Sequence, residues 1–233
     1  STILTEDLDG DGQIDLVAGN FGMNNQYKVS GNRPMTLYYA DYDLNTAIDP
    51  IINYYIGDKS YPMPTLDELI GQSPMFKKRF PKYGLYTDAT IETILKPEEL
   101  KKSKILTART LETQYFRNQG GKFVLQSLPL QAQYAPVMDI EVMDVNNDGV
   151  KDLVLAGNIS QIRARFGRAT GNYGVVLLGD GRGGFEYMPQ LKSGLNIRGD
   201  VRGVIRDGNR LIFSVNNGAP VAYEKTDISA AVY

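Results

Sequence analysis

The sequence predicts an all-β fold with a small helical insertion, and three observations support this prediction. Short apolar runs, rich in β-branched and aromatic residues, alternate with clusters of Asp, Asn and Gly, as in strands joined by tight turns. The 24 glycines supply many such turns. With 233 residues, 42% of them hydrophobic, the chain is long enough to bury a core without disulfides. We therefore expect a single domain over residues 1–233.

The clearest predicted strands are four apolar runs that each end at a turn. They cover residues 14–18, 36–40, 152–156 and 174–178. Glycine-rich hairpin turns are predicted at 118–123 and 179–185. Strands joined by hairpins run antiparallel, so we expect antiparallel sheets.

Residues 61–107 have a helical pattern instead. Thr65 and Glu68 have the spacing of a capping box, which predicts a helix that begins between them. A second helix is predicted within 89–95, and Pro97 suits the first position of a third helix over 97–102. Because the segment is shorter than 50 residues, we interpret it as an insertion between strands rather than a second domain.

An internal repeat is the strongest feature of the sequence. Residues 7–20 (DLDGDGQIDLVAGN) and 144–158 (DVNNDGVKDLVLAGN) match position for position through an acidic loop. A third copy, residues 41–49 (DYDLNTAID), keeps the polar positions but lacks the glycine, and a fourth at 207–213 is weaker. We call residues 7–15 loop 1, 41–49 loop 2 and 144–152 loop 3.

The loops share the pattern D-x-[DN]-x-[DN]-x-x-x-D, which predicts calcium binding. Side-chain oxygens at positions 1, 3, 5 and 9 and the backbone carbonyl of position 7 suit Ca²⁺, which takes six to eight oxygen ligands. The predicted ligands are Asp7, Asp9, Asp11, Gln13 and Asp15 in loop 1, Asp41, Asp43, Asn45, Ala47 and Asp49 in loop 2, and Asp144, Asn146, Asp148, Val150 and Asp152 in loop 3. Two sites are expected in loops 1 and 3, and loop 2, without its glycine, is a third candidate.

Two other interpretations of the loops are weaker. An EF-hand needs a Glu at position 12, where this chain has Ala18 and Leu155, and strand-like runs follow each loop instead of helices. Asp, Asn and Gly also form ordinary turns, but two loops that agree at every ligand position are hard to explain that way. The three loops hold ten carboxylates, whose mutual repulsion predicts that bound calcium stabilises the fold.

The composition excludes several functions. The chain has neither His nor Cys, which removes His-dependent catalysis, thiol nucleophiles, disulfides and Cys-based metal sites. A net charge of −2 gives no basic excess for a nucleic-acid partner. No apolar stretch is long enough for a membrane span. Residues 1–6 do not resemble a signal peptide, so either a signal has been removed or the chain is a piece of a longer polypeptide.

Two regions outside the loops are candidate ligand-binding surfaces. Arg163, Arg165 and Arg168 lie in one irregular segment directly after a predicted strand, and arginine is enriched at interfaces. The insertion contributes three tyrosines, at 61, 83 and 86, near Lys82. A glycan or a protein is the expected partner. The RGD tripeptide at 198–200 is interpreted as a chance match, with at least one member buried.

The loops also carry a family resemblance. Together with LGDGRGGFEYMP and FRNQGGKFVLQSLP, which resemble outer hairpins, they are similar to the FG-GAP/VCBS repeats of integrin-α-like β-propellers. The order of segments resembles the C-terminal part of large bacterial surface proteins with VCBS repeats. The resemblance implies β-propeller-like blades, in which each Asp loop links two strands and binds calcium structurally. The chain is too short for a closed seven-bladed ring, so we expect a partial propeller, or one that closes in an unusual way.

These observations predict a metal-binding β-propeller-type module, with calcium as the expected metal, that acts in cell adhesion or ligand binding. We expect it to be extracellular, at the cell surface or in the periplasm, and not to be an enzyme. The alternative is a carbohydrate-active enzyme or its glycan-binding domain, and a third possibility is a structural spacer within a large surface protein. The sequence offers no carboxylate pair apart from the loops for glycosidic chemistry.

Overall fold

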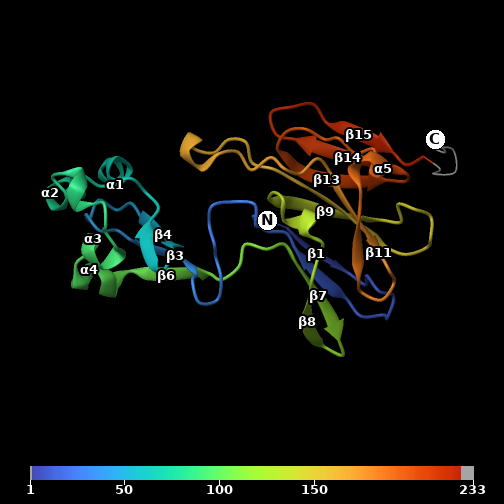
Figure 1. The fold of residues 1–233 in the computed structure, drawn as a ribbon, viewed down its shortest axis with the longest axis horizontal. Coiled ribbons are helices and arrows are strands. Elements are labelled where there is room, and N and C mark those ends of the chain that lie inside the picture. Colours follow the sequence, from blue (N-terminus) through green and yellow to red (C-terminus); the bar gives the residue numbers. More distant parts are fainter. Residues whose placement is uncertain (1, 227–233) are drawn as a thin grey trace. The chain divides into compact units, whose positions relative to one another are not determined.

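The computed structural model describes residues 2–226, and the chain divides into two compact units. Unit 1 contains the residues up to 26 and from 112 onward, and unit 2 contains residues 27–111. Three antiparallel sheets lie in unit 1, and a fourth sheet lies in unit 2 with helices α1 to α4 (Figure 1). The described part is mostly β, so the all-β prediction is confirmed at this level.

Unit 1 is built from eleven strands in three sheets. Sheet I has the order β1-β2-β7-β8 and contains β1 (Ile3–Glu6), β2 (Asp15–Ala18), β7 (Gln114–Gln119) and β8 (Lys122–Gln126). Sheet II has the order β12-β11-β10-β9 and contains β9 (Val137–Met143), β10 (Asp152–Gly157), β11 (Val175–Gly179) and β12 (Phe185–Met188). Sheet III contains β13 (Val201–Asp207), β14 (Arg210–Val215) and β15 (Val221–Glu224) in chain order. The connections include short helical turns at η2 (Leu130–Gln133), η3 (Ala164–Phe166) and α5 (Gln190–Ser193).

Sheet II lies between two hydrophobic cores of unit 1. Leu153 and Leu155 of β10 pack in a core shared with Val17 and Tyr115 of sheet I. Val154 and Ala156 belong to a second core, which they share with the inward residues of sheet III. Successive strand residues point to opposite faces, so β10 is buried on both sides and every one of its residues is buried.

Unit 2 contains sheet IV, in the order β5-β4-β3-β6, and the helical segment. Its strands are β3 (Met35–Ala40), β4 (Asp49–Ile56), β5 (Lys59–Pro62) and β6 (Lys104–Ala108). Its helices are α1 (Leu66–Gln72), α2 (Met75–Arg79), η1 (Tyr83–Leu85), α3 (Ile91–Ile94) and α4 (Pro97–Lys102). The helices therefore lie inside the predicted segment 61–107.

The local sequence explains these helices. The Thr65 hydroxyl accepts a hydrogen bond from the Glu68 amide, and the Glu68 carboxylate accepts one from the Thr65 amide, so the predicted capping box forms. Pro97 occupies the first turn of α4, where its missing N–H costs nothing. The helices form a core with sheet IV through the fully buried residues Leu69, Phe76, Ile94 and Ile51. Among residues 2–226, no helix is long and apolar enough to cross a membrane.

Candidate metal-binding loops

Each acidic loop joins the first two strands of its sheet. Loop 1 connects β1 to β2, loop 2 connects β3 to β4, and loop 3 connects β9 to β10. The loops share one backbone conformation, because positions 4 and 6 are left-handed in all three. The φ angles are 75° and 86° at Gly10 and Gly12, 62° and 74° at Leu44 and Thr46, and 65° and 83° at Asn147 and Gly149. Loop 2 therefore adopts without glycine the turn that glycine permits in the other loops.

The first Asp of each loop organises this turn. Asp7 accepts hydrogen bonds from the amides of Gly10 and Gly12, at 2.8 and 3.0 Å. Asp144 accepts the equivalent bonds from Asn147 and Gly149, at 2.7 and 3.0 Å. In loop 2, Asp41 accepts from Asn45 and Thr46, at 3.0 and 2.9 Å. The three loops thus use the same residue type at the same position for the same purpose.

Position 5 of each loop holds position 7 by a short local bond. The amides of Gln13, Ala47 and Val150 donate to the side chains of Asp11, Asn45 and Asp148, at 2.8, 2.7 and 2.7 Å. This bond fixes the amide of position 7, the residue whose carbonyl the sequence predicts as a ligand. The Gln13 side chain also accepts from the Gly120 amide at 2.9 Å, which ties loop 1 to the β7–β8 hairpin.

The ninth residue of each loop is a buried aspartate. Asp15, Asp49 and Asp152 are 0%, 1% and 0% exposed. Their carboxylates accept backbone amides from the second residue of the same loop, and Asp152 also accepts the Gly179 amide at 2.9 Å. Burial raises the pKa of Asp49 and of Asp152, against the lowering effect of these hydrogen bonds. These residues both close the loop and fix it to the sheet.

Carboxylates converge in two of the loops. Oxygens of Asp7, Asp9 and Asp15 lie within 4.8 Å of one another, and so do oxygens of Asp41, Asp43 and Asp49. Loop 3 has Asn146 at position 3, which gives an amide oxygen where the other loops have a carboxylate. Positions 1, 3 and 9 therefore converge in loops 1 and 2, as the sequence predicted for metal ligands, and Asp11 lies outside its group.

The chemistry of the two clusters fits a hard cation. Oδ1 of Asp43 is buried, and no hydrogen bond to it is found among the described residues. Its other oxygen, Oδ2, accepts a hydrogen bond of 2.8 Å from the Ser73 hydroxyl. This bond orients the carboxylate and leaves Oδ1 for a metal. In loop 1, Arg117 Nε lies 2.5 Å from Asp9 Oδ2, and the Asp9 side chain is 1% exposed. This oxygen is therefore held in an ion pair with Arg117, although the two atoms do not form a well-aligned hydrogen bond.

The arginine segment lies in the long connection between β10 and β11. Its base is fixed by Asn158 and Asn172, which exchange hydrogen bonds of 2.6 and 2.9 Å, and by a bridge between Ile159 and Ala169. Arg163, Arg165 and Arg168 are exposed in the segment that this bridge closes, and the Arg165 guanidinium lies 4.3 Å from the centre of the Phe166 ring. The structure thus places the three arginines together on one braced loop.

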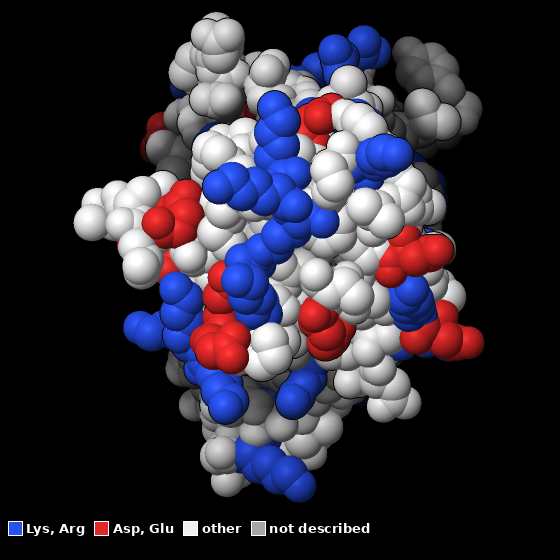
Figure 2. Space-filling view, turned by 90° about the vertical axis from the view of Figure 1, so that its left-hand side faces the viewer, with Lys and Arg blue, Asp and Glu red and all other residues white. Residues whose placement is uncertain are grey.

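The other predicted surface residues have mixed roles. Tyr86 donates to the Pro64 carbonyl at 2.8 Å and packs edge-on against Phe80, so it is structural, whereas Tyr83 is 61% exposed. The Asp200 side chain of the RGD tripeptide is buried and accepts from the amide and hydroxyl of Ser160. On the face drawn in Figure 2, Lys and Arg gather in runs with Asp and Glu beside them.

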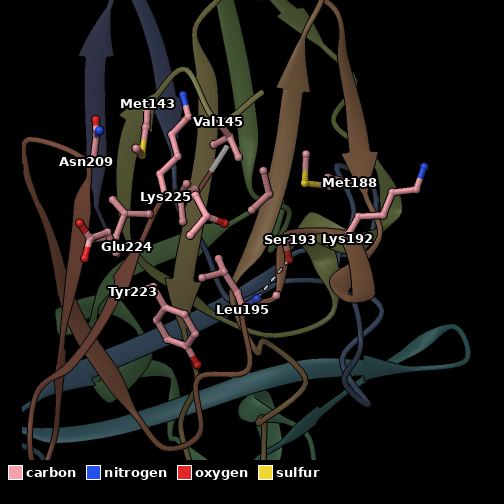
Figure 3. A pocket seen from close by; sticks show the side chains of 15 residues that line it. Met143, Val145, Met188, Lys192, Ser193, Leu195, Asn209, Tyr223, Glu224 and Lys225 are labelled. Carbon is pink, nitrogen blue, oxygen red and sulfur yellow. Dashed lines mark hydrogen bonds between the residues drawn. The ribbon is translucent and has the colours of Figure 1, made fainter. Parts of the chain in front are cut away.

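Two of the cavities in the described residues have walls that could hold a ligand, and neither is lined by the acidic clusters. In unit 1, a cavity of about 240 Å³ between sheets II and III has apolar walls, which include Met143, Met188 and Tyr223 (Figure 3). Lys192 and Lys225 lie at separate places on its rim. In unit 2, a polar cavity of about 330 Å³ is lined by residues that include Tyr38, Tyr55, Ser60, Thr90 and Glu92.

The sequence interpretation missed residues that hold the loops from outside. Ser73 follows α1, Arg117 lies in β7, and no spacing rule connects either residue with its loop. Their contacts come from the pairing of distant strands and from helix packing, which a single sequence does not reveal. The resemblance to FG-GAP/VCBS repeats remains a prediction, because comparisons with family models, curated proteins and solved structures found no match.

Proposed function

We propose that this chain is a calcium-binding, β-propeller-type module of a surface or secreted protein, which acts in adhesion or in binding a glycan or protein ligand. The observation that carries the proposal is the common conformation of loops 1, 2 and 3. Three segments of different sequence have the same two left-handed positions, and in each the first Asp accepts a hydrogen bond from the amide of position 6. A shared ligand requirement explains why Leu44 and Thr46 adopt a conformation that non-glycine residues avoid.

The sheet arrangement supports the propeller part of the proposal. Sheets I, II and III succeed one another, and β9 contacts β1 on one side and β13 on the other. Consecutive antiparallel sheets that meet through their first strands are the arrangement of propeller blades. An acidic loop follows the first strand in two of these three sheets, I and II, and a third such loop lies in sheet IV of unit 2.

Calcium binding is tested by metal analysis, calorimetric titration and thermal unfolding of the full chain in EDTA and in millimolar calcium. We expect two or three ions per chain and a higher melting temperature with calcium than with magnesium, whose smaller octahedral shell suits these loops less well. Asp7→Asn, Asp41→Asn and Asp144→Asn should each remove one site. Asp88→Asn, in the exposed turn after η1, is the charge-matched control. Absence of bound metal and of any thermal shift would contradict the proposal.

The ligand-binding part rests on two different surfaces. The braced arginine loop suits an acidic partner, because three cations lie within six residues. The polar cavity of unit 2 suits a neutral sugar, because aromatic rings beside hydroxyl and carboxylate groups offer both stacking and hydrogen bonds.

Glycan arrays with neutral and sulfated oligosaccharides separate these two surfaces. R163A/R165A/R168A should lose sulfated ligands, whereas the control R182A/R206A/R210A, in which three other exposed arginines are replaced, should keep them. Tyr55→Ala should lose neutral ligands alone. If every ligand detected binds both variants as tightly as the wild-type chain, neither surface is the binding site.

A further inference from the structure

A lysine from outside each loop contacts the same atom of all three loops. Lys151 Nζ donates to the backbone carbonyl of Asp7 at 2.7 Å, and Lys102 Nζ donates to that of Asp41 at 2.6 Å. Lys225 Nζ donates to the carbonyl of Asp144. Each acceptor is the peptide oxygen of position 1, although the three lysines come from unrelated places in the chain. We call Lys102, Lys151 and Lys225 the loop lysines.

Each loop lysine also has a second contact that holds it at its loop. Lys151 pairs with Glu6, the residue before loop 1, at 2.6 Å. Lys225 donates to the side chain of Asn147, at position 4 of loop 3. Lys102 lies 5.7 Å from the ring centre of Tyr42, at position 2 of loop 2. Because each ammonium makes two contacts, its position is better defined than in a single exposed ion pair, which has little effect on stability.

The positive charges stand beside the atoms that would bind a metal. The position-1 carboxylates already accept two backbone amides, so each lysine adds a unit charge without pairing directly with that carboxylate. A cation near the carboxylates offsets part of their mutual repulsion in the metal-free loop. The same charge repels an incoming divalent ion. Both effects lower the affinity of the loop for a metal.

We propose that the loop lysines are positioning residues of the calcium sites. Each ammonium holds the first peptide of its loop while no metal is bound and opposes entry of a divalent cation, so that the loops load only at high calcium. This inference rests on the proposed function, since it concerns the affinity of the same loops. It implies that dissociation constants lie in the range of about 10⁻⁴–10⁻³ M, which is typical of extracellular modules.

In unit 1 the loop lysines also connect neighbouring sheets. Lys151 is the eighth residue of loop 3 in sheet II, and it holds loop 1 of sheet I. Lys225 follows β15 of sheet III and holds loop 3 of sheet II. Loops 1 and 3 are thus each fastened to the next sheet along the chain. Loss of the lysine should therefore loosen the contact between the sheets as well as change the metal site.

The test uses Lys225, because a matched control lies on the same cavity rim. Lys225→Met and Lys192→Met each remove one positive charge from this rim, but only Lys225 contacts loop 3 (Figure 3). A ¹⁵N-resolved NMR titration of the full chain with calcium follows the position-6 amides of Gly12, Thr46 and Gly149. These amides report the three loops separately, because each donates to the first Asp of its own loop.

We expect Lys225→Met to tighten calcium binding at Gly149 by about fivefold and to leave Gly12 and Thr46 unchanged. Its melting temperature in EDTA should fall below that of Lys192→Met. Lys225→Gln, which keeps an N–H donor without the charge, should tighten binding with a smaller fall in melting temperature. If Lys225→Met does not fold, Lys102→Met in unit 2, read at Thr46, tests the same prediction.

The outcomes separate this inference from the proposed function. If calcium does not shift the signals of the three amides in the wild-type chain, both the inference and the proposed function are contradicted. If the wild-type amides respond but Lys225→Met and Lys225→Gln bind calcium at Gly149 no more tightly than Lys192→Met, the loops are calcium sites and the role of the lysines is wrong. An equal gain at Gly149 in Lys192→Met would also overturn it, because the effect would then come from net charge alone.

Discussion

The hydroxyl of Tyr115 donates a hydrogen bond of 3.1 Å to Asp15 Oδ2, and both side chains are fully buried. This bond joins the last residue of loop 1 to the strand that pairs with β2. Burial, followed by the charge of Asp15, raises the pKa of Tyr115, so the phenol remains a donor at every physiological pH.

Tyr115→Phe should therefore destabilise unit 1. The substitution keeps the ring but leaves a buried carboxylate short of one donor, which costs about 1–3 kcal/mol. Denaturant unfolding in EDTA measures the effect. Tyr173→Phe, which alters an exposed ring, should change stability by less than about 0.5 kcal/mol, and equal effects of the two substitutions would contradict this interpretation.

Thr46→Gly should stabilise unit 2. Thr46 has φ of 74°, a conformation that costs a β-branched residue about 1–2 kcal/mol and costs glycine little. The bond from its amide to Asp41 is kept in the variant. Gly12→Thr, the reverse change at the equivalent position of loop 1, should destabilise, although a Cβ there meets no atom within 4 Å. Opposite signs for these two variants in thermal unfolding would confirm the shared loop conformation.

Ser73→Ala should weaken the site in loop 2. The buried Ser73 hydroxyl orients Asp43, and loss of such an outer contact typically lowers metal affinity by about 10–100-fold. Calcium titration read at the Thr46 amide measures this change. The exposed Ser127→Ala, in unit 1, is the control, and an unchanged affinity in both variants would remove Ser73 from the site.

Unit 2 should lose stability in acid through Glu99. Burial alone would raise the pKa of Glu99, but two bonds of 2.7 and 2.6 Å from Arg79 and one from the Lys96 amide hold it below the ordinary value of 4.5. The stabilisation is complete above the unfolded pKa and is lost as pH falls through the lower folded pKa.

Glu99→Gln should therefore cost about 2 kcal/mol at pH 7, and the difference from the wild-type chain should vanish as the pH falls well below 4.5. Unfolding curves between pH 7 and pH 2 check this prediction. Glu98→Gln, on the exposed side of α4, should show no such pH dependence. A penalty for Glu99→Gln that persists at the lowest pH would show that the charge is not its cause.

The strands and loops could be predicted because their signals are local. The run at 152–156 lies in β10, the run at 174–178 overlaps β11 from Val175 onward, and the capping box of Thr65 begins α1 where its spacing predicts. The repeat placed the three loops, including the one without glycine. Left-handed φ at Leu44 and Thr46 was not predictable from those residues, because their own preferences oppose it.

The division into two units and the outer contacts of the loops depend on distant parts of the chain. Lys151 lies more than 140 residues from Asp7, and Lys225 lies about 80 residues from Asp144. Such pairs follow from how sheets stack, and neither periodicity nor spacing encodes them. The helical segment was identified by its pattern, but its association with sheet IV as a separate compact unit was not.

Strand β10 is buried on both faces, and this affects how its register with the neighbouring strands is fixed. Most strands are held in register by the penalty for turning polar residues inward, and this strand has no such penalty, since 153–156 are all apolar. A slip by one residue would exchange two leucines for valine and alanine, so only a mismatch of volumes would resist it. The two ends of β10 fix the register instead. Asp152 is tied to two amides, and a side chain at Gly157 would place its Cβ 1.8 Å from the Pro136 carbonyl oxygen. Alignment of the most buried strand in unit 1 is thus decided by its first and last residues.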